Sequence, residues 1–168
     1  MPAIPPAKGD KADELFTPPL GGRMKGKIIS VNISADKGEK KHNIHKCMLK
    51  EGHGLTEDAH AGPWHRQVSL LATESIKKIK DKGLDVHAGD FAENLTTEGI
   101  DLPALPVGTK LKVGENIIMK VTQIGKECHT RCNIFYQVGD CVMPREGIFA
   151  EVLTGGEIKV GDEIEVVQ

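Results

Sequence analysis

Short stretches with the alternating or apolar pattern of β-strands make up much of this chain. Residues 26–33 alternate between apolar and polar positions after Ile28 and are rich in β-branched side chains. Because successive side chains on a strand point to opposite faces, this period of two predicts a strand. The other segments predicted to contain strands are residues 44–49, 109–113, 117–124, 148–153 and 158–167.

One segment has the pattern of a helix. It follows the apolar run 68–72, begins with Thr73 as the expected N-cap, and places Ile76 and Ile79 on one face. Gly83 supplies a stop signal, so we expect the helix to end near residue 82. Many short strands with one clear helix predict a mainly β protein with a few helices, built as a small barrel or curled sheet.

Composition narrows the class of protein. A length of 168 residues fits one domain, and a net charge of −2 gives no sign of nucleic-acid binding or of an anionic membrane partner. No apolar run approaches the roughly 20 residues that span a bilayer, and the N-terminus lacks the pattern of a signal peptide. We therefore expect a cytoplasmic protein.

The N-terminal segment differs from the rest of the chain. Residues 1–23 hold five of the nine prolines and few large apolar side chains. Such a segment cannot repay the entropy lost on ordering, which predicts a flexible tail before a single domain at residues 24–168. The alternative is an arm that pairs with the edge of a sheet.

A cluster of thiols is the clearest chemical feature. Cys128, Cys132 and Cys141 fall within fourteen residues, and His129 and Arg131 lie beside them. Nearby positive charge favours the thiolate, which is the form that attacks and ligates metals. In a reducing compartment, clustered cysteines are more often reactive or metal-binding than disulfide-linked.

The spacing of the cysteines bears on three other roles for these thiols. The spacing of Cys128 and Cys132 would suit zinc, but the second pair of ligands typical of structural zinc is absent from the sequence. A C-x-x-C redox pair is also absent. Cys141, and Cys47 in a predicted strand, are instead expected to be small buried side chains.

A second group of polar residues lies in the predicted loop at residues 50–65. Asp58 is surrounded by three histidines, including His60, which suits a metal, a proton relay or an anion. The alternative is a polar loop held by hydrogen bonds. Trp64 would provide a stacking surface or a lid over the core, and Asn94 would recognise an amide-like ring edge or hold a turn.

The order of several segments resembles the MOSC domain, the module named after the C-terminal region of molybdenum cofactor sulfurases. The similarity covers about residues 26–167, and its specificity comes from the joint presence of the segments rather than from any one of them. These segments are residues 26–33, 54–62, 66–71, 89–95, 105–108, 131–132 and 156–162.

The resemblance implies a single-domain MOSC-type β-barrel, similar to the β-barrel of pyruvate kinase. It also implies a cysteine that ligates the molybdenum of the molybdenum cofactor (molybdopterin) or carries a persulfide sulfur. In larger relatives that reduce N-hydroxylated compounds, this cysteine follows an arginine. That pattern falls on Cys132, with Cys128 as the second candidate.

The same resemblance suggests the residues around the cofactor. Arg131, Lys126 and Arg145 would offset the thiolate charge or bind the phosphate of the cofactor. The pocket that holds the pterin edge would be lined by Asp58, His60 and Asn94.

Three functions follow from these expectations. The first is a molybdenum-cofactor-binding or sulfur-carrier protein for metal–sulfur centre assembly, and the second is a molybdenum-dependent reductase of N-hydroxylated bases or amines. The third is a non-catalytic binding module with structural or zinc-binding cysteines. The sequence shows neither a pyridoxal-phosphate desulfurase domain nor the additional N-terminal β-barrel of larger relatives. Expected partners are therefore enzymes of cofactor biosynthesis and a sulfur donor such as a cysteine desulfurase.

Overall fold

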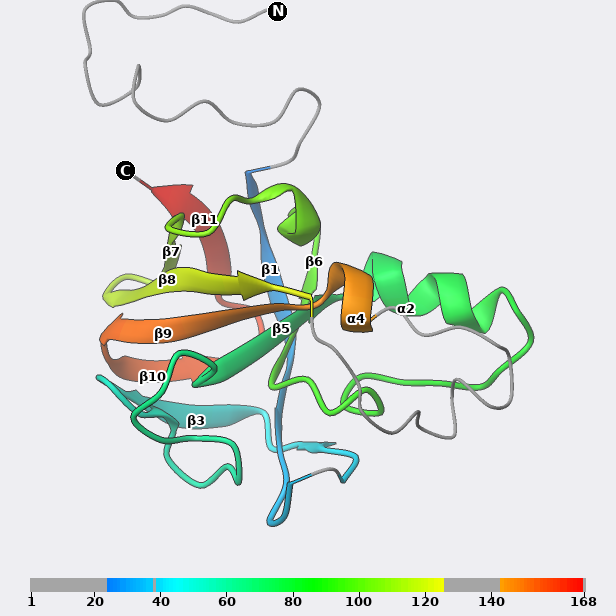
Figure 1. Cartoon of the computed structure of the whole chain (residues 1–168), viewed down its shortest axis with the longest axis horizontal. Coiled ribbons are helices and arrows are strands. Elements are labelled where there is room, and N and C mark those ends of the chain that lie inside the picture. The colour runs from blue at the N-terminus through cyan, green and yellow to red at the C-terminus, as the bar shows by residue number, and fades with distance from the viewer. Residues whose placement is uncertain (1–23, 38, 126–142, 168) are drawn as a thin grey trace, which may run out of the picture.

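The protein is a closed barrel of seven strands with a small second sheet on one side (Figure 1). The computed structural model describes residues 24–37, 39–125 and 143–167. The barrel strands are β1 (Lys25–Ile33), β11 (Glu163–Val167), β7 (Lys110–Val113), β8 (Ile117–Ile124), β9 (Ile148–Thr154), β5 (Val68–Ala72) and β6 (Leu95–Glu98), in the order in which they pair. Pairing of β11 with β1 closes the barrel. The predicted β-rich barrel is confirmed.

The pairing and burial pattern of the strands explain why the barrel closes. All barrel pairs are antiparallel except β5 and β6, which run parallel. The side chains of β8 alternate between buried and partly exposed positions over most of its length, as expected for a strand with one face toward a core. One apolar cluster that includes Ile28, Leu70, Met119 and Ile164 fills the barrel interior. Closure thus removes most exposed sheet edges and buries an aliphatic core.

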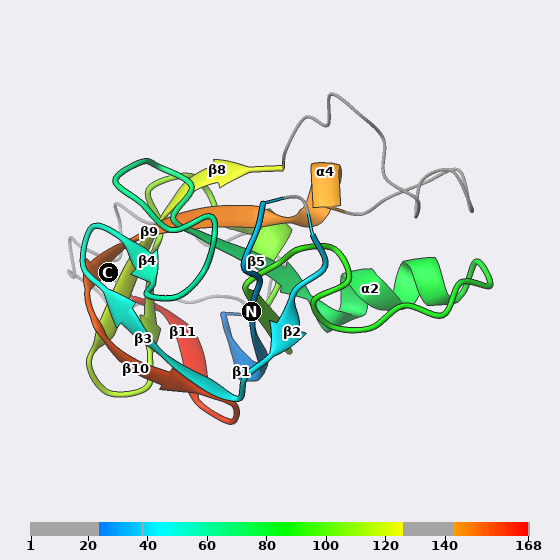
Figure 2. The same ribbon diagram turned by 90° about the horizontal axis from the view of Figure 1, so that it is seen from below.

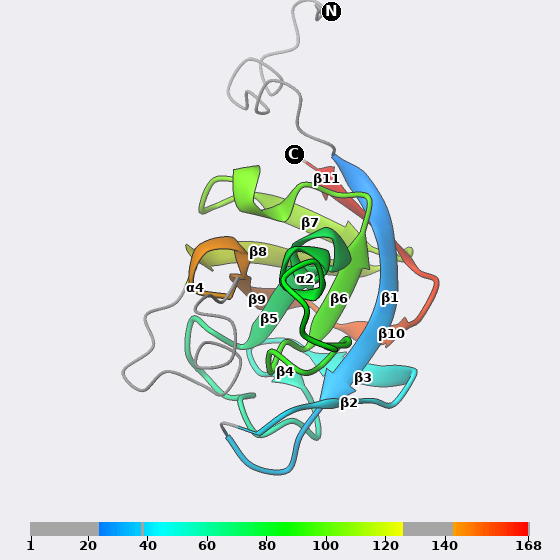
Figure 3. The same ribbon diagram turned by 90° about the vertical axis from the view of Figure 1, so that its right-hand side faces the viewer.

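Strand β1 is long and bent, and it pairs with three partners (Figure 3). Its first residues pair with β11, its middle pairs with β6, and its end pairs with the two-residue strand β2 (His42–Asn43). The register shifts between Ile28 and Ser30, which is the position of a bulge. A bulge bends a strand and increases its twist, so the end of β1 is carried away from the barrel toward β2.

Helix α2 (Thr73–Lys80) projects from the barrel wall directly after β5 (Figures 1 and 2). Its buried residues Ile76 and Ile79 join Leu71 and Phe149 in a second apolar cluster, so both faces of β5 are covered. The helix was predicted correctly, but the predicted cap was wrong. Thr73 is the first helical residue, the N-cap is Ala72, and no side chain caps the end.

The second sheet comprises β10 (Gly156–Lys159), β3 (Lys46–Lys50) and β4 (Gly54–Leu55). The predicted strand at residues 158–167 is therefore two strands, β10 and β11. Gly161 separates them with a φ of 99°, a backbone conformation that favours glycine. Cys47 on β3 is 9% exposed and packs in the barrel core, which confirms the prediction of a buried thiol.

Two short helices complete the described structure, η1 (Leu102–Ala104) and α4 (Met143–Glu146). In the ranges that the structure describes, no helix has the length and apolar character needed to cross a membrane.

Candidate functional site

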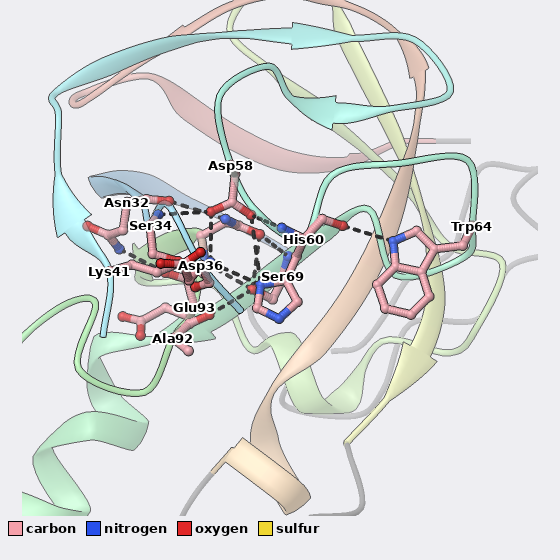
Figure 4. A network of polar contacts seen from close by, with 11 residues as sticks. Asn32, Ser34, Asp36, Lys41, Asp58, His60, Trp64, Ser69, Ala92 and Glu93 are labelled. Atoms are coloured by element: carbon pink, nitrogen blue, oxygen red, sulfur yellow. Dashed lines mark hydrogen bonds and ion pairs between the residues drawn. The ribbon is translucent and has the colours of Figure 1, made fainter. Parts of the chain in front are cut away.

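A buried ion pair forms the centre of the candidate site (Figure 4). Lys41 lies just before β2, and Asp58 lies in the loop after β4. The Lys41 Nζ donates to Asp58 Oδ1 at 2.7 Å, and both side chains are completely buried. The backbone N–H of Ser34 donates to the same oxygen at 3.1 Å. The end of β1 and two loops are therefore joined at one carboxylate.

The backbone packing around Lys41 fixes its position. The N–H of Lys41 donates to the carbonyl of Gly89 at 2.8 Å. Gly89 has a φ of 91°, and a Cβ there would lie 2.1 Å from the carbonyl oxygen of Lys41. Only glycine permits so close an approach of the two chains. Gly89 is thus part of the support of the ion pair.

The environment of Asp58 holds it as a carboxylate. Burial by itself raises the pKa of Asp58, but hydrogen bonds from Lys41 and Asn94 and the positive charge of Lys41 have a larger combined effect. The pKa of Asp58 is therefore below its ordinary value. An Asp with a lowered pKa stabilises the fold at neutral pH, and this contribution is lost as the pH falls through its folded-state pKa.

His60 connects the ion pair to the surface. Its Nδ1 lies 3.0 Å from the Lys41 Nζ, and its side chain is 24% exposed. Because an ammonium group only donates, Nδ1 must accept, which assigns the neutral tautomer with the proton on Nε2. The backbone N–H of His60 also donates to Asp58 Oδ2 at 3.0 Å. Lys41 therefore contacts the imidazole ring, and Asp58 holds the backbone of His60.

The Asn94 side chain joins the strands next to this site by hydrogen bonds. Its Oδ1 accepts hydrogen bonds from the backbone N–H and the hydroxyl of Ser69, at 2.9 and 3.1 Å. Its Nδ2 donates to the carbonyl of Asn32 at 3.2 Å, and the residue is 1% exposed. The side chain therefore ties β5 to the end of β1. Its predicted contact with a cofactor stays a prediction.

Glu93 is a fully buried carboxyl group beside Asn94. Its oxygens accept from the N–H groups of Gly89 and Phe91 at 2.8 and 3.3 Å, and from the Thr96 hydroxyl at 2.6 Å. Burial raises the pKa of Glu93 to about 6, although these hydrogen bonds lower it. Glu93, a titratable group, therefore holds the loop at Gly89 that positions Lys41.

The raised pKa of Glu93 predicts a dependence of stability on pH. The folded state holds the proton more tightly than the unfolded state, so this contribution is full below pH 4.5 and is lost as the pH rises through about 6. The free energy of unfolding of the wild type minus that of Glu93→Gln should therefore fall by about 2 kcal/mol between about pH 3.5 and pH 7.5. Urea denaturation of both proteins checks this difference, and a difference that is constant with pH contradicts it.

The structure brings together only some of the predicted site residues. Asp58 and His60 lie together, and Asn94 adjoins them. Arg145 lies on α4, where the neighbouring Glu146 bonds to Ser75 and Lys78 of α2, so it is beside α2 rather than next to the ion pair. The N-terminal tail 1–23 and the predicted site residues Cys132, Cys128, Arg131 and Lys126 lie outside the described residues.

Sequence reasoning missed Lys41. It stands at the end of a polar, turn-like segment, where a lysine is ordinarily solvated, and its partner is 17 residues away. Among the residues described, no group of three His, Cys, Asp or Glu side chains is placed to hold a metal ion.

The fold and site define a single small β-barrel with a buried polar cluster at the end of its longest strand. The chain belongs to the MOSC domain family, whose model matches residues 57–165. No curated protein is similar enough in sequence to count as a match.

Solved structures with the same fold come from several bacteria. The YuaD protein of Bacillus subtilis superposes with a TM-score of 0.69 at 19% identity, covering 86% of this chain and 96% of its own. YiiM from Geobacillus stearothermophilus superposes with a TM-score of 0.63 at 19% identity, and the match covers 85% of this chain and 75% of YiiM. YiiM from Escherichia coli superposes with a TM-score of 0.62 at 18% identity, and the match covers 86% of this chain and 70% of YiiM. At these identities the likeness establishes the fold.

Proposed function

We propose that this protein binds the molybdenum cofactor, with Cys132 as the thiolate that ligates molybdenum or carries a persulfide sulfur. Family membership supports this class of function. The structural observation behind the proposal is the buried Lys41–Asp58 pair that fixes the tautomer and direction of His60. A buried pair is costly to form, and such clusters are often found at functional sites.

The chemistry of His60 supports binding of a pterin edge. A pterin ring presents both donors and acceptors, and His60 supplies an oriented ring at a partly exposed position. Asn94 and Ser69 hold the underlying strands in place. A soft thiolate such as Cys132 matches a metal–sulfur centre. When bound, the molybdenum centre would supply redox or sulfur-transfer chemistry.

The residues of this chain then have distinct roles. Cys132 binds the metal or the sulfur, and Arg131 and Lys126 offset the thiolate charge. Asp58 and Lys41 act as positioning residues through His60. The assignment of Arg145 as a phosphate contact rests on the family resemblance alone.

Cofactor content tests the role of Cys132. The wild type, Cys132→Ser and the matched control Cys128→Ser are produced with a molybdopterin source and purified anaerobically. Because serine lacks the soft sulfur ligand, we expect Cys132→Ser to retain about a tenth or less of the wild-type molybdenum or persulfide, corresponding to at least about 1.4 kcal/mol of binding. We expect Cys128→Ser to resemble the wild type. Equal retention by wild type and Cys132→Ser would reject the proposal.

A further inference from the structure

Arg66 occupies an unusual environment next to the site loop. It lies just before β5, with its guanidinium carbon 4.7 Å from the centre of the Trp64 ring and 5.4 Å from that of Phe149. The residue is mostly buried. Contacts between a guanidinium group and aromatic faces are favourable, but they do not replace hydrogen bonds to its N–H groups.

One N–H group of the guanidinium lacks an acceptor among the described residues. Its Nε is buried and has no hydrogen-bond partner there, and no carboxylate of the described chain pairs with it. The guanidinium group is a positively charged donor with no acceptor atom of its own. Buried polar groups are almost always satisfied, so an unpaired Nε leaves the guanidinium group with capacity to bind a further acceptor.

A second cation lies beside the same indole ring. The Nζ of the exposed Lys37 is 5.5 Å from the centre of the Trp64 ring. Trp64 also donates from Nε1 to the carbonyl of His60 at 2.9 Å, which links this group to the buried ion pair. Two positive charges around one ring, next to His60, favour an anionic ligand over a neutral or cationic one.

We propose that Arg66, assisted by Lys37, binds a phosphate group beside His60. The planar fork of arginine matches phosphate oxygens, and the two cations together suit a dianion. This inference goes beyond the proposed function because it rests on the contacts of Arg66 itself. It assigns phosphate binding to a residue other than those suggested by the family resemblance.

Trp64 provides a direct readout, since it is the only tryptophan in the sequence. Inorganic phosphate is titrated into the cofactor-free protein at constant ionic strength, with sodium chloride as the screening control, and Trp64 fluorescence is recorded. The wild type should show a saturable change. Arg66→Lys should raise the Kd for phosphate about tenfold or more, because lysine lacks the planar fork of N–H donors of arginine. Arg66→Met should abolish the response. Lys80→Met on α2 removes the same charge elsewhere and should leave Kd unchanged.

Stability separates loss of binding from misfolding. In phosphate-free buffer, Arg66→Met should have a Tm no lower than that of the wild type, because the substitution removes a buried charge without an acceptor. Phosphate should raise the Tm of the wild type and not that of the variant. The proposal is overturned if the wild type shows no saturable response, or if Arg66→Met responds with the same midpoint.

Cofactor-loaded protein identifies the source of the phosphate. Loss of the response on loading would assign the site to the phosphate of the cofactor, and a retained response would assign it to a separate phosphate-bearing ligand. Both results support an anion site at Arg66. A protein that binds phosphate through Arg66 but retains no molybdenum or pterin would keep this inference and remove the proposed function.

Discussion

Replacing Lys41 with Met is expected to lower the free energy of unfolding by about 3–5 kcal/mol at pH 7. The substitution leaves the Asp58 carboxylate buried with only backbone N–H donors from Ser34 and His60 and the nearby amide of Asn94. Removal of one partner from a buried pair exposes the full cost of the remaining charge. A typical domain is stable by only about 5–15 kcal/mol, so the change should be visible in urea denaturation.

The pH dependence identifies the cause of this loss. Without the Lys41 charge, the pKa of Asp58 should rise, so the variant relieves the cost by protonating Asp58 in acid. The difference between wild type and Lys41→Met should therefore shrink as the pH falls from 7 toward 5. The double variant Lys41→Met/Asp58→Asn, which removes both charges, should recover much of the lost stability. A loss below about 1 kcal/mol at pH 7, typical of an exposed pair, would contradict the account.

Replacing Gly89 with Ala should be similarly damaging, with a loss of about 3 kcal/mol or more. The new Cβ would lie 2.1 Å from the Lys41 carbonyl oxygen and 2.9 Å from its carbonyl carbon, at a φ of 91°. Both contacts are with backbone atoms, so no rotamer change relieves them. The loop must move, and the hydrogen bond from the Lys41 N–H to Gly89 is strained or lost.

Gly83 offers a matched control for this substitution. It has a φ of 99°, but a Cβ there would have no atom within 4 Å. Gly83→Ala should therefore cost only the backbone strain, about 1–2 kcal/mol. The free energies of unfolding of the two variants are compared in urea. Equal losses in Gly89→Ala and Gly83→Ala would show that the close contact with Lys41 does not matter.

Local patterns in the sequence predicted much of the barrel. The alternating or β-rich segments at residues 26–33 and 117–124 correspond to β1 and β8, since side-chain period and β-propensity are local properties. The pattern did not separate β10 from β11, because the apolar residues continue through the turn at Gly161. The parallel pairing of β5 with β6 depends on contacts between distant segments.

The site was predictable only in part. Asp58 and His60 lie close in sequence and are residue types with evident chemistry, so the loop could be identified. Lys41 and Arg66 resemble ordinary surface cations in the sequence, and their burial depends on how separate segments pack. Long-range packing, rather than residue type, determines the environment of these two side chains.

The molybdenum and pterin content of the anaerobically purified wild-type protein, produced with a molybdopterin source, tests the central claim most directly. The proposed function predicts about one pterin per chain, with either molybdenum in equal amount or a persulfide on Cys132. Trace amounts of molybdenum, pterin and persulfide, with stoichiometric zinc in their place, would contradict it and support a zinc-binding module instead.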